Sequence, residues 1–210
     1  MAALWLVRHG QSAWNLAGRI QGQSARAGSL TPAGRGQAEQ AAAELAAVAP
    51  GAVAVVASDL ARAAETAAII AGRLGLPLWF DAGLREQHLG ALEGLRSTAS
   101  DGGDVLDRLW DDPYRRPPGG ESVASLYDRV QRTLRRLRQT QFNSELIVVT
   151  HGGPVRVATA ACLPPPGSPL PRTAVANASI TPWPRPVPAG RATGQVASPP
   201  AGRQTEIVAP

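Results

Sequence analysis

Short apolar runs that predict buried strands recur along the chain, and segments with helical spacing separate them. Residues 3–7, 53–57 and 146–150 are almost continuously apolar, which is typical of strands covered on both faces. Two further strands are expected at residues 78–80 and 174–181. Because such runs are short, they predict the centre of a sheet rather than a set of helices.

The segments between these runs have the spacing of amphipathic helices. Thr31 and Pro32 form a typical helix start, and the pattern continues to about residue 48. Further helices are expected over residues 59–74, 123–138 and 154–162. Strands that alternate with helices predict an α/β fold, a three-layer α/β/α sandwich around a mostly parallel central sheet.

The length of 210 residues suits one such domain, which we place at residues 1–181. Within it, residues 95–121 contain two clusters rich in Gly and Pro, and we expect an irregular insertion that covers the site. Residues 182–210 are rich in Pro, Gly, Ala and Ser and lack apolar periodicity. This composition predicts a poorly ordered tail.

Charge adds little to this picture. The formal net charge is +5, and all 21 basic residues are arginine. A basic balance can indicate nucleic acid or phosphorylated ligands. The sequence contains no basic patch studded with aromatic residues, which argues against a nucleic-acid partner. The densest arginine group, within residues 129–138, falls largely on the polar side of an amphipathic helix, where we expect it to be solvated.

The sequence also predicts a cytoplasmic protein without a membrane partner. No stretch approaches the roughly 20 apolar residues of a membrane span. The first ten residues lack the basic region of a signal peptide. Cys162 is the one cysteine and cannot form an internal disulfide, so a cytosolic setting is the default.

Two of the three histidines occupy equivalent places. His9 follows the first expected strand, His151 follows the strand at residues 146–150, and glycine follows each of them. The carboxyl ends of parallel strands border the ligand crevice of an α/β sheet. These two histidines, far apart in the sequence, are therefore expected to face each other.

Three charged residues lie near the same expected edge. Arg8 precedes His9, Arg62 falls in the first helical turn after the second strand, and Glu86 follows the strand at residues 78–80. Guanidinium groups bind phosphate in a bidentate manner and stay charged at any working pH. A carboxylic acid can protonate a leaving oxygen. Taken alone, each of these residues is equally consistent with a surface charge.

The segments around these residues resemble the signature of the histidine phosphatase superfamily, the phosphoglycerate-mutase-like proteins. The resemblance covers roughly residues 3–181. The matching segments stand in the family order at residues 6–15 (LVRHGQSAWN), 30–38 (LTPAGRGQA), 58–67 (SDLARAAETA), 84–94 (LREQHLGALEG), 120–122 (GES) and 150–153 (THGG). An Arg-His-Gly triplet alone is a weak signal, but the whole series is specific.

The resemblance implies a role for each matching residue. His9 would accept the phosphoryl group, Glu86 would protonate the leaving alkoxide, and Arg8, Arg62 and His151 would hold the phosphate. Substrate-binding positions would include Asn15, Gly152 and the backbone around Gly22 and Gln23. Such a site needs no metal and no cofactor, because phosphoryl transfer depends mostly on positioning and electrostatic stabilisation. The sequence also lacks a compact Asp/Glu/His cluster that suggests a metal site.

Some positions depart from the family pattern or extend it. Where the phosphate loop of the family often reads Gln-Gly-x-x-Asp, residues 21–26 read QGQSAR, which leaves the specificity of this loop open. His88 is a candidate substrate contact, with a structural role as the alternative. Arg115 and Arg116 are candidates to bind a substrate carboxylate or a second phosphate, with solvated charges as the alternative.

The sequence therefore predicts a phosphomonoesterase that hydrolyses a small phosphorylated metabolite through a phosphohistidine intermediate. A phosphoglycerate-type mutase shares this chemistry and is the first alternative. The length of about 181 residues without the tail, and the His-Gly-Gly at residues 151–153, favour the phosphatase. A catalytically inactive module that binds a phosphate ligand is the alternative from another class. The partner is a small-molecule phosphate ester, a homodimer stays an option, and the physiological substrate is not readable from the sequence.

Overall fold

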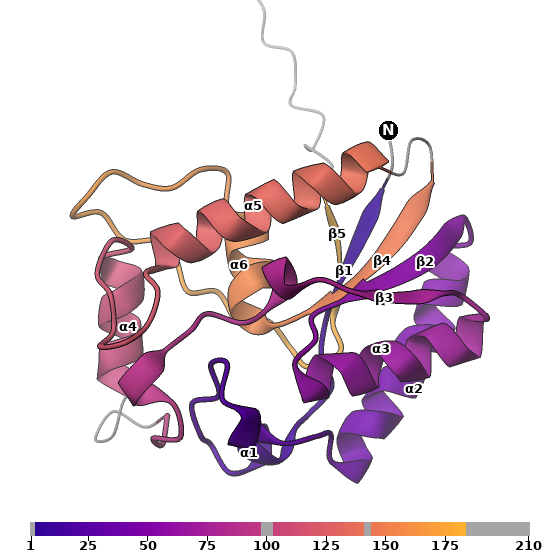
Figure 1. The fold of residues 1–210 in the computed structure, drawn as a ribbon, viewed down its shortest axis with the longest axis horizontal. Coiled ribbons are helices and arrows are strands. Elements are labelled where there is room, and N and C mark those ends of the chain that lie inside the picture. Colours follow the sequence, from indigo (N-terminus) through magenta and orange to yellow (C-terminus); the bar gives the residue numbers. More distant parts are fainter. Residues whose placement is uncertain (1–2, 98–102, 141–143, 184–210) are drawn as a thin grey trace, which may run out of the picture.

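The computed structural model describes residues 3–97, 103–140 and 144–183. In this part of the chain, five strands form one sheet in the order β3-β2-β4-β1-β5 (Figure 1). The strands are β1 (Leu4–Arg8), β2 (Ala52–Ala57), β3 (Leu78–Phe80), β4 (Glu145–Thr150) and β5 (Ile180–Trp183). The first four are mutually parallel, and β5 runs antiparallel to β1 at one edge.

Helices cover both faces of this sheet. The helices are α1 (Ala13–Leu16), α2 (Pro32–Val48), α3 (Ala61–Leu74), α4 (Gly103–Asp111), α5 (Val123–Thr140) and α6 (Gly152–Thr159), with short 3-10 turns at Ala25–Ala27, Ala82–Leu84 and Gly90–Leu92. The pair α2 and α3 lies on one face, and α5 and α6 lie on the other (Figure 1). The predicted three-layer sandwich with a mostly parallel sheet is confirmed.

Two separate hydrophobic cores explain why the strand sequences are apolar at nearly every position. In β1, Leu4 and Leu6 face the core under α5 and α6, whereas Val7 faces the core under α2 and α3. In β4, Leu146 and Val148 face the core under α5 and α6, and Ile147 and Val149 face the core under α2 and α3. Successive side chains of a strand point to opposite faces of the sheet. A sheet that is covered by helices on both faces therefore needs apolar residues at both odd and even positions of its strands.

Two expected elements have different bounds in the structure. The sixth helix begins at Gly152 rather than at residue 154, because His151 has the extended backbone of an N-cap. Residues 95–121, expected to be irregular, contain the helix α4. Leu106, Leu109 and Trp110 bury one side of this helix against the larger core. Residues 98–102 of the same stretch lie outside the described residues.

The last strand was expected at residues 174–181, and the structure places β5 at Ile180–Trp183 instead. Residues before this strand do not pair with the sheet but contact the carboxyl end of β1. The Val175 carbonyl accepts a hydrogen bond from Arg8, and Asn177 Nδ2 donates to the His9 carbonyl at 3.0 Å. Pro182 and Trp183 therefore belong to the sheet and not to the predicted tail. The rest of that tail, residues 184–210, lies outside the described residues.

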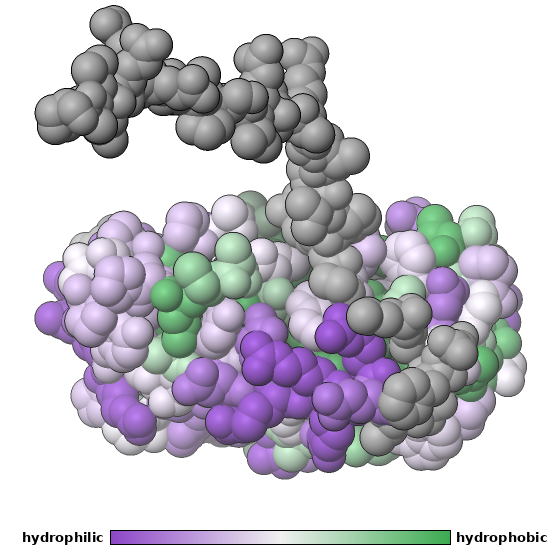
Figure 2. All heavy atoms as spheres, turned by 90° about the horizontal axis from the view of Figure 1, so that it is seen from above, coloured by the Kyte–Doolittle hydropathy of each residue, from purple (hydrophilic) through white to green (hydrophobic). Residues whose placement is uncertain are grey.

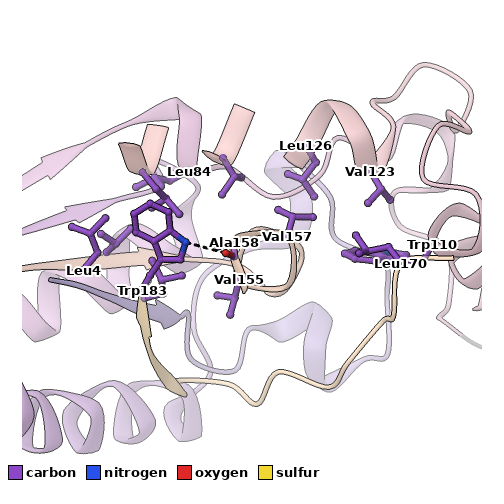
Figure 3. Close-up of a cluster of buried hydrophobic side chains, with 14 of the residues drawn as sticks. Leu4, Leu84, Trp110, Val123, Leu126, Val155, Val157, Ala158, Leu170 and Trp183 are labelled. Atoms are coloured by element: carbon purple, nitrogen blue, oxygen red, sulfur yellow. Dashed lines mark hydrogen bonds between the residues drawn. The ribbon is translucent and has the colours of Figure 1, made fainter. Parts of the chain in front are cut away.

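Trp183 joins β5 to the core beneath α6. Its indole is 8% exposed, and its Nε1 donates to the Ala158 carbonyl at 2.9 Å (Figure 3). Figure 3 shows the ring close to Leu4, Leu84 and Val155. A chain that ends at Thr181 would lack this contact.

Trp183→Ala is expected to lower the free energy of unfolding by about 3–5 kcal/mol, the usual cost of removing a large aromatic side chain from a core. Chemical denaturation monitored by circular dichroism measures this. Trp79→Ala is the matched control, because Trp79 lies on the edge strand β3 and is 51% exposed. Equal losses in both variants would contradict the assignment of Trp183 to the core.

The face seen from above in Figure 2 carries a broad group of hydrophilic side chains, on the side where α5 lies in Figure 1. Arg132, Arg135 and Arg136 of α5 are exposed, as the amphipathic pattern predicted. Arg129 differs, because it is half-buried and donates to the carbonyl of Arg85.

Within the described ranges, no helix has both the length and the apolar character that crossing a membrane requires.

Candidate active site

Neighbouring parallel strands bring His9 and His151 together. Arg8 at the end of β1 is in register with Thr150 at the end of β4, and the His9 amide donates to the Thr150 carbonyl at 2.9 Å. The centroids of the two imidazole rings are 5.1 Å apart. Their exposed fractions are 2% and 0%. The two strand-end histidines thus lie side by side, as the sequence predicted.

Hydrogen bonds define which nitrogen of His9 is available for chemistry. Nδ1 lies 2.7 Å from the carbonyl oxygen of Gly10, and a carbonyl can only accept, so Nδ1 carries the proton. The lone pair is therefore on Nε2, where Arg62 Nε donates at 3.2 Å. The imidazole is held in the tautomer that presents a nucleophilic Nε2.

His151 is held from the neighbouring strand β2. Its Nε2 lies 2.8 Å from the hydroxyl of Ser58, which directly follows β2 and also accepts a hydrogen bond from the Leu60 amide. A hydroxyl has one hydrogen and two lone pairs, so it can accept from Leu60 and still either donate to Nε2 or accept from it, and this contact fits both tautomers of His151. This buried Nδ1 has no hydrogen-bond partner within the described chain, and the same is true of Arg8 Nε. Buried polar atoms without partners are rare in proteins. Arg8 Nε is always a donor and suits an oxyanion ligand, and Nδ1 of His151 suits one in the tautomer that protonates it.

Arg62 and Arg8 place two cations beside His9. Arg62 lies in the first turn of α3, is 2% exposed and donates from Nη2 to the Gly22 carbonyl at 2.8 Å. Burial lowers the pKa of Arg62 to about 10, although the Glu86 carboxylate partly offsets this effect. Burial likewise lowers the pKa of Arg8. At neutral pH Arg62 remains protonated.

The same environment keeps both histidines neutral. Burial lowers the pKa of His9 well below its ordinary value, and the positive charges of Arg62 and Arg8 lower it further. Burial, followed by the charge of Arg62, also lowers the pKa of His151. A neutral imidazole is a competent nucleophile, so the electrostatics of the site suit the tautomer described above.

Glu86 stands on the loop after β3 and is held through its carboxylate and its backbone. One carboxylate oxygen accepts from the Gln87 amide at 2.8 Å, and the other accepts from the Gly153 amide at 3.2 Å. Arg129 of α5 donates to the carbonyls of Arg85 and Glu86 at 2.9 and 3.3 Å. This arginine, which the sequence predicted to be solvated with its neighbours, instead positions the Glu86 loop.

A pocket of ≈ 230 Å³ opens at this edge of the sheet. The predicted site residues that line it are Arg8, His9, Asn15, Gly22, Arg62, Glu86 and Gly152. The oxygen of the Asn15 side chain accepts from Ser12 and Asn177, at 3.1 and 3.3 Å, which leaves its NH₂ group for another acceptor. The structure therefore brings most of the predicted constellation around one cavity.

The other predicted residues lie elsewhere. His151 is buried beside His9 and does not line the pocket, and Gln23 donates from its side chain to the Glu86 carbonyl at 2.9 Å. His88 is exposed, with its Nε2 3.8 Å from Glu93. Arg115 and Arg116 are exposed and do not reach the pocket. In the structure described here, none of the last three contacts the cavity.

The lining residues that were not predicted include Arg19, Trp110, Arg156 and Arg172. Arg156 could have been found, because it lies one helical turn after Gly152 in a helix that starts at the site, and residues four apart share one face of a helix. Arg172 lies in a stretch without strand or helix, and no local signal marks it. Among the described residues, no group of three or more His, Cys, Asp or Glu side chains is arranged to hold a metal ion.

Gly153 is required by the position of Glu86. A Cβ on residue 153 would overlap the Glu86 carboxylate, whereas a Cβ on Gly72 of α3 would meet no atom within 4 Å. Gly153→Ala is therefore expected to displace the carboxylate and to lower kcat/KM for alkyl phosphates about 10- to 100-fold, the scale of a misplaced catalytic group. Steady-state kinetics with Gly72→Ala as the control measures this. Full activity in the Gly153 variant would mean that Glu86 does not act from this position.

Comparisons with known proteins identify the family. The model of the histidine phosphatase superfamily (branch 1) matches residues 4–183. Phosphoglycerate mutase-like protein 4 of Arabidopsis thaliana is 36% identical over 74% of this chain and 68% of its own length. Glucosyl-3-phosphoglycerate phosphatase of Mycolicibacterium vanbaalenii is 37% identical over 76% and 73%.

A solved structure gives the same result. The mycobacterial glucosyl-3-phosphoglycerate phosphatase in complex with VO3 superposes with a TM-score of 0.75 at 32% identity, over 87% of this chain and 90% of that one. The fold, the sequence relatives and the family model therefore agree. The chain belongs to the histidine phosphatase superfamily, branch 1.

Proposed function

We propose that this chain is a phosphomonoesterase that transfers the phosphoryl group of a small metabolite to Nε2 of His9 and then to water. The observation that carries the proposal is the neutral His9 imidazole, whose Nε2 lone pair accepts from the buried guanidinium of Arg62 at a pocket that Arg8 also lines. Superfamily membership supports the same chemistry.

In the first step, Nε2 of His9 attacks phosphorus while the bond from phosphorus to the ester oxygen breaks. The leaving alkoxide is a strong base, so it needs a proton, which a protonated Glu86 supplies from the same pocket. In the second step, water attacks the phosphohistidine and the P–N bond breaks. The Glu86 carboxylate accepts the proton of that water, which returns the enzyme to its starting state.

Positive groups stabilise the charge on the transferred phosphoryl oxygens. Arg8 and Arg62 supply fixed cations, and Nδ1 of His151, which has no partner among the described residues, supplies a further donor next to His9 when it carries the proton. Preorganised donors of this kind are the main source of catalysis in phosphoryl transfer, since the transition state spreads charge over three equatorial oxygens. The arrangement therefore performs without a metal the task that Mg²⁺ performs in kinases.

A mutase would use the same first step but would hand the phosphoryl group to a second hydroxyl group. A curated relative is named as mutase-like and another as a phosphatase. The experiment that separates them is release of inorganic phosphate across a panel of phosphorylated metabolites, with product analysis for positional isomers. Phosphate release without isomers is expected. Isomers without phosphate release would make the chain a mutase, and neither product would favour a binding module.

Exhaustive chelation is expected to leave turnover unchanged, because arginine and histidine side chains supply all the charge stabilisation in this mechanism. The measurement is phosphate release before and after dialysis against a strong chelator. A matched sample that receives Mg²⁺ or Zn²⁺ after dialysis is the control. If activity disappeared with the chelator and returned with either ion, the account of metal-free catalysis would be wrong.

A cytoplasmic location, a homodimer and the lack of a nucleic-acid partner stay predictions from the sequence.

A further inference from the structure

We propose that Asn177 is a positioning residue of the active site, whose side-chain amide joins the backbone of His9 to the side chain of Asn15. The inference rests on the proposed function, under which Asn15 binds an oxygen of the transferred phosphate. It adds the residue that fixes this amide relative to the nucleophile. Asn177 lies between α6 and β5 and does not itself line the described pocket, so its effect on the reaction passes through residues that do.

The amide nitrogen of Asn177 contacts two oxygen atoms that can only accept hydrogen bonds. Nδ2 lies 3.0 Å from the His9 carbonyl oxygen and 3.3 Å from Oδ1 of Asn15. The orientation of the Asn15 amide is fixed independently, because the Ser12 backbone amide donates to the same Oδ1 at 3.1 Å. A primary amide has two hydrogens, so Asn177 can donate one to each oxygen. The side chain thus bridges two residues that line the pocket.

These contacts determine which end of the Asn15 amide is left for a ligand. Its oxygen accepts from Ser12 and Asn177, so the NH₂ group is the end that can bind an anion. The bond from Ser12 belongs to the capping box of α1 and ties the amide to its own helix. Asn177 supplies the contact that ties the same amide to the strand end that carries His9.

The His9 carbonyl is a rigid point of attachment for this bridge. It also accepts from the Ala178 amide at 3.2 Å, and the Gly10 amide of the same peptide donates to Thr66 Oγ1 at 3.1 Å. Because a peptide group is planar, bonds at both of its ends fix its orientation. The next carbonyl, that of Gly10, contacts Nδ1 of the nucleophile. The bridge therefore ends on the backbone that also orients the His9 ring.

The backbone that carries Asn177 adopts an unfavourable conformation. Ala178 has a φ of 56°, and in the part of the chain that the structure describes it is the one non-glycine residue with a positive φ. Such outliers persist where surrounding contacts require them, and they cluster at functional sites. On one side, the Ser179 carbonyl accepts from the Arg8 amide at 3.2 Å. On the other side, Asn177 and Ala178 both donate to the His9 carbonyl.

Strand pairing explains the backbone contacts of this turn but not the bridge. In the antiparallel pair of β1 and β5, Val7 lies opposite Ile180. The backbone bonds of the turn to Arg8 and His9 extend that pairing. A ladder uses backbone groups alone, so it needs no side chain at position 177. The two contacts of the Asn177 amide therefore require an explanation of their own, and the position of Asn15 provides it.

The test is a double-mutant cycle on kcat/KM for a nitrophenyl phosphate. Asn177→Ala is expected to lower kcat/KM about 10- to 100-fold, the scale of a misplaced catalytic group. In an Asn15→Ala background the same change is expected to cost less, by about threefold or more, because residues in contact are coupled. Equal losses in both backgrounds would mean that Asn177 does not act through Asn15 and would overturn the proposal.

Two further variants separate donation from packing. Asn177→Leu nearly keeps the shape of the side chain without a donor and is expected to lose as much activity as Asn177→Ala. Gln40→Ala removes an amide from an exposed position of α2 and is expected to leave kcat/KM unchanged. Thermal unfolding reports on the fold of each variant. Full activity of Asn177→Leu, or unfolding midpoints that fall in parallel with kcat/KM, would refute the positioning role.

Binding of inorganic phosphate separates this inference from the proposed function. Titration calorimetry compares the unaltered protein, Asn177→Ala, Asn15→Ala and the double variant. Asn177→Ala is expected to weaken phosphate binding in the unaltered background and to have no further effect when Asn15 is absent. Phosphate binding with this dependence, but without hydrolysis of any ester, would refute the proposed function alone. The same phosphate affinity with and without the Asn177 amide would overturn the positioning role.

Discussion

His9→Ala is expected to abolish phosphatase turnover, with a loss of about 10⁴-fold or more, the scale seen when a covalent nucleophile is removed. The reason is chemical rather than structural. Nε2 of His9 has the lone pair that would bond to phosphorus, and no other unprotonated nitrogen among the described pocket residues is fixed beside Arg62. Phosphate release from a substrate of the panel measures the loss.

The covalent intermediate gives this prediction a second readout. Wild-type protein that is quenched in base during turnover is expected to hold one phosphoryl group per chain on His9, stable in base and labile in acid. His88→Ala is the matched control, because His88 is exposed and outside the pocket, and it is expected to keep both the adduct and the activity. Substantial turnover by His9→Ala would end the covalent proposal.

Glu86→Gln is expected to reduce turnover of an alkyl phosphate about 10²-fold or more, the usual contribution of a general acid, and to affect a nitrophenyl phosphate much less in the phosphorylation step. An alkoxide needs a proton as it leaves, whereas a nitrophenolate is a stable anion. Gln keeps the size of the side chain and can accept from one of the two amides, Gln87 or Gly153, that donate to the Glu86 carboxylate, but it has no acidic proton to transfer. Single-turnover kinetics with both esters measures the difference.

The second step provides an internal check on the same residue. If Glu86 also accepts the proton of the attacking water, the variant is expected to accumulate phosphohistidine and to show a burst with the aryl ester. Glu44→Gln, on the exposed side of α2, makes the same chemical change and is expected to be silent. Equal losses for both esters in the phosphorylation step would exclude Glu86 as the acid.

The sequence by itself determined the elements that local physics controls. Strand segments that are apolar at every position required a sheet covered on both faces. In such a parallel sheet the carboxyl ends of β1 and β4 lie side by side, which places His9 and His151 at one edge. The cap formed by Thr31 and Pro32 began α2 at the expected residue. Periodicity, capping and the position of strand ends act over a few residues, which is why they can be read from the chain.

Only the tertiary structure decided which residues line the pocket around His9 and His151. Arg115 and Arg116 carry the same charge as Arg156, yet they are exposed while Arg156 lines the cavity. Arg129 shares an amphipathic pattern with solvated arginines, but the Glu86 loop folds onto it. The last strand includes Trp183, whose ring packs in the core and donates to the Ala158 carbonyl of α6. Each outcome depends on residues distant in sequence that meet in space, and no local pattern contains that information.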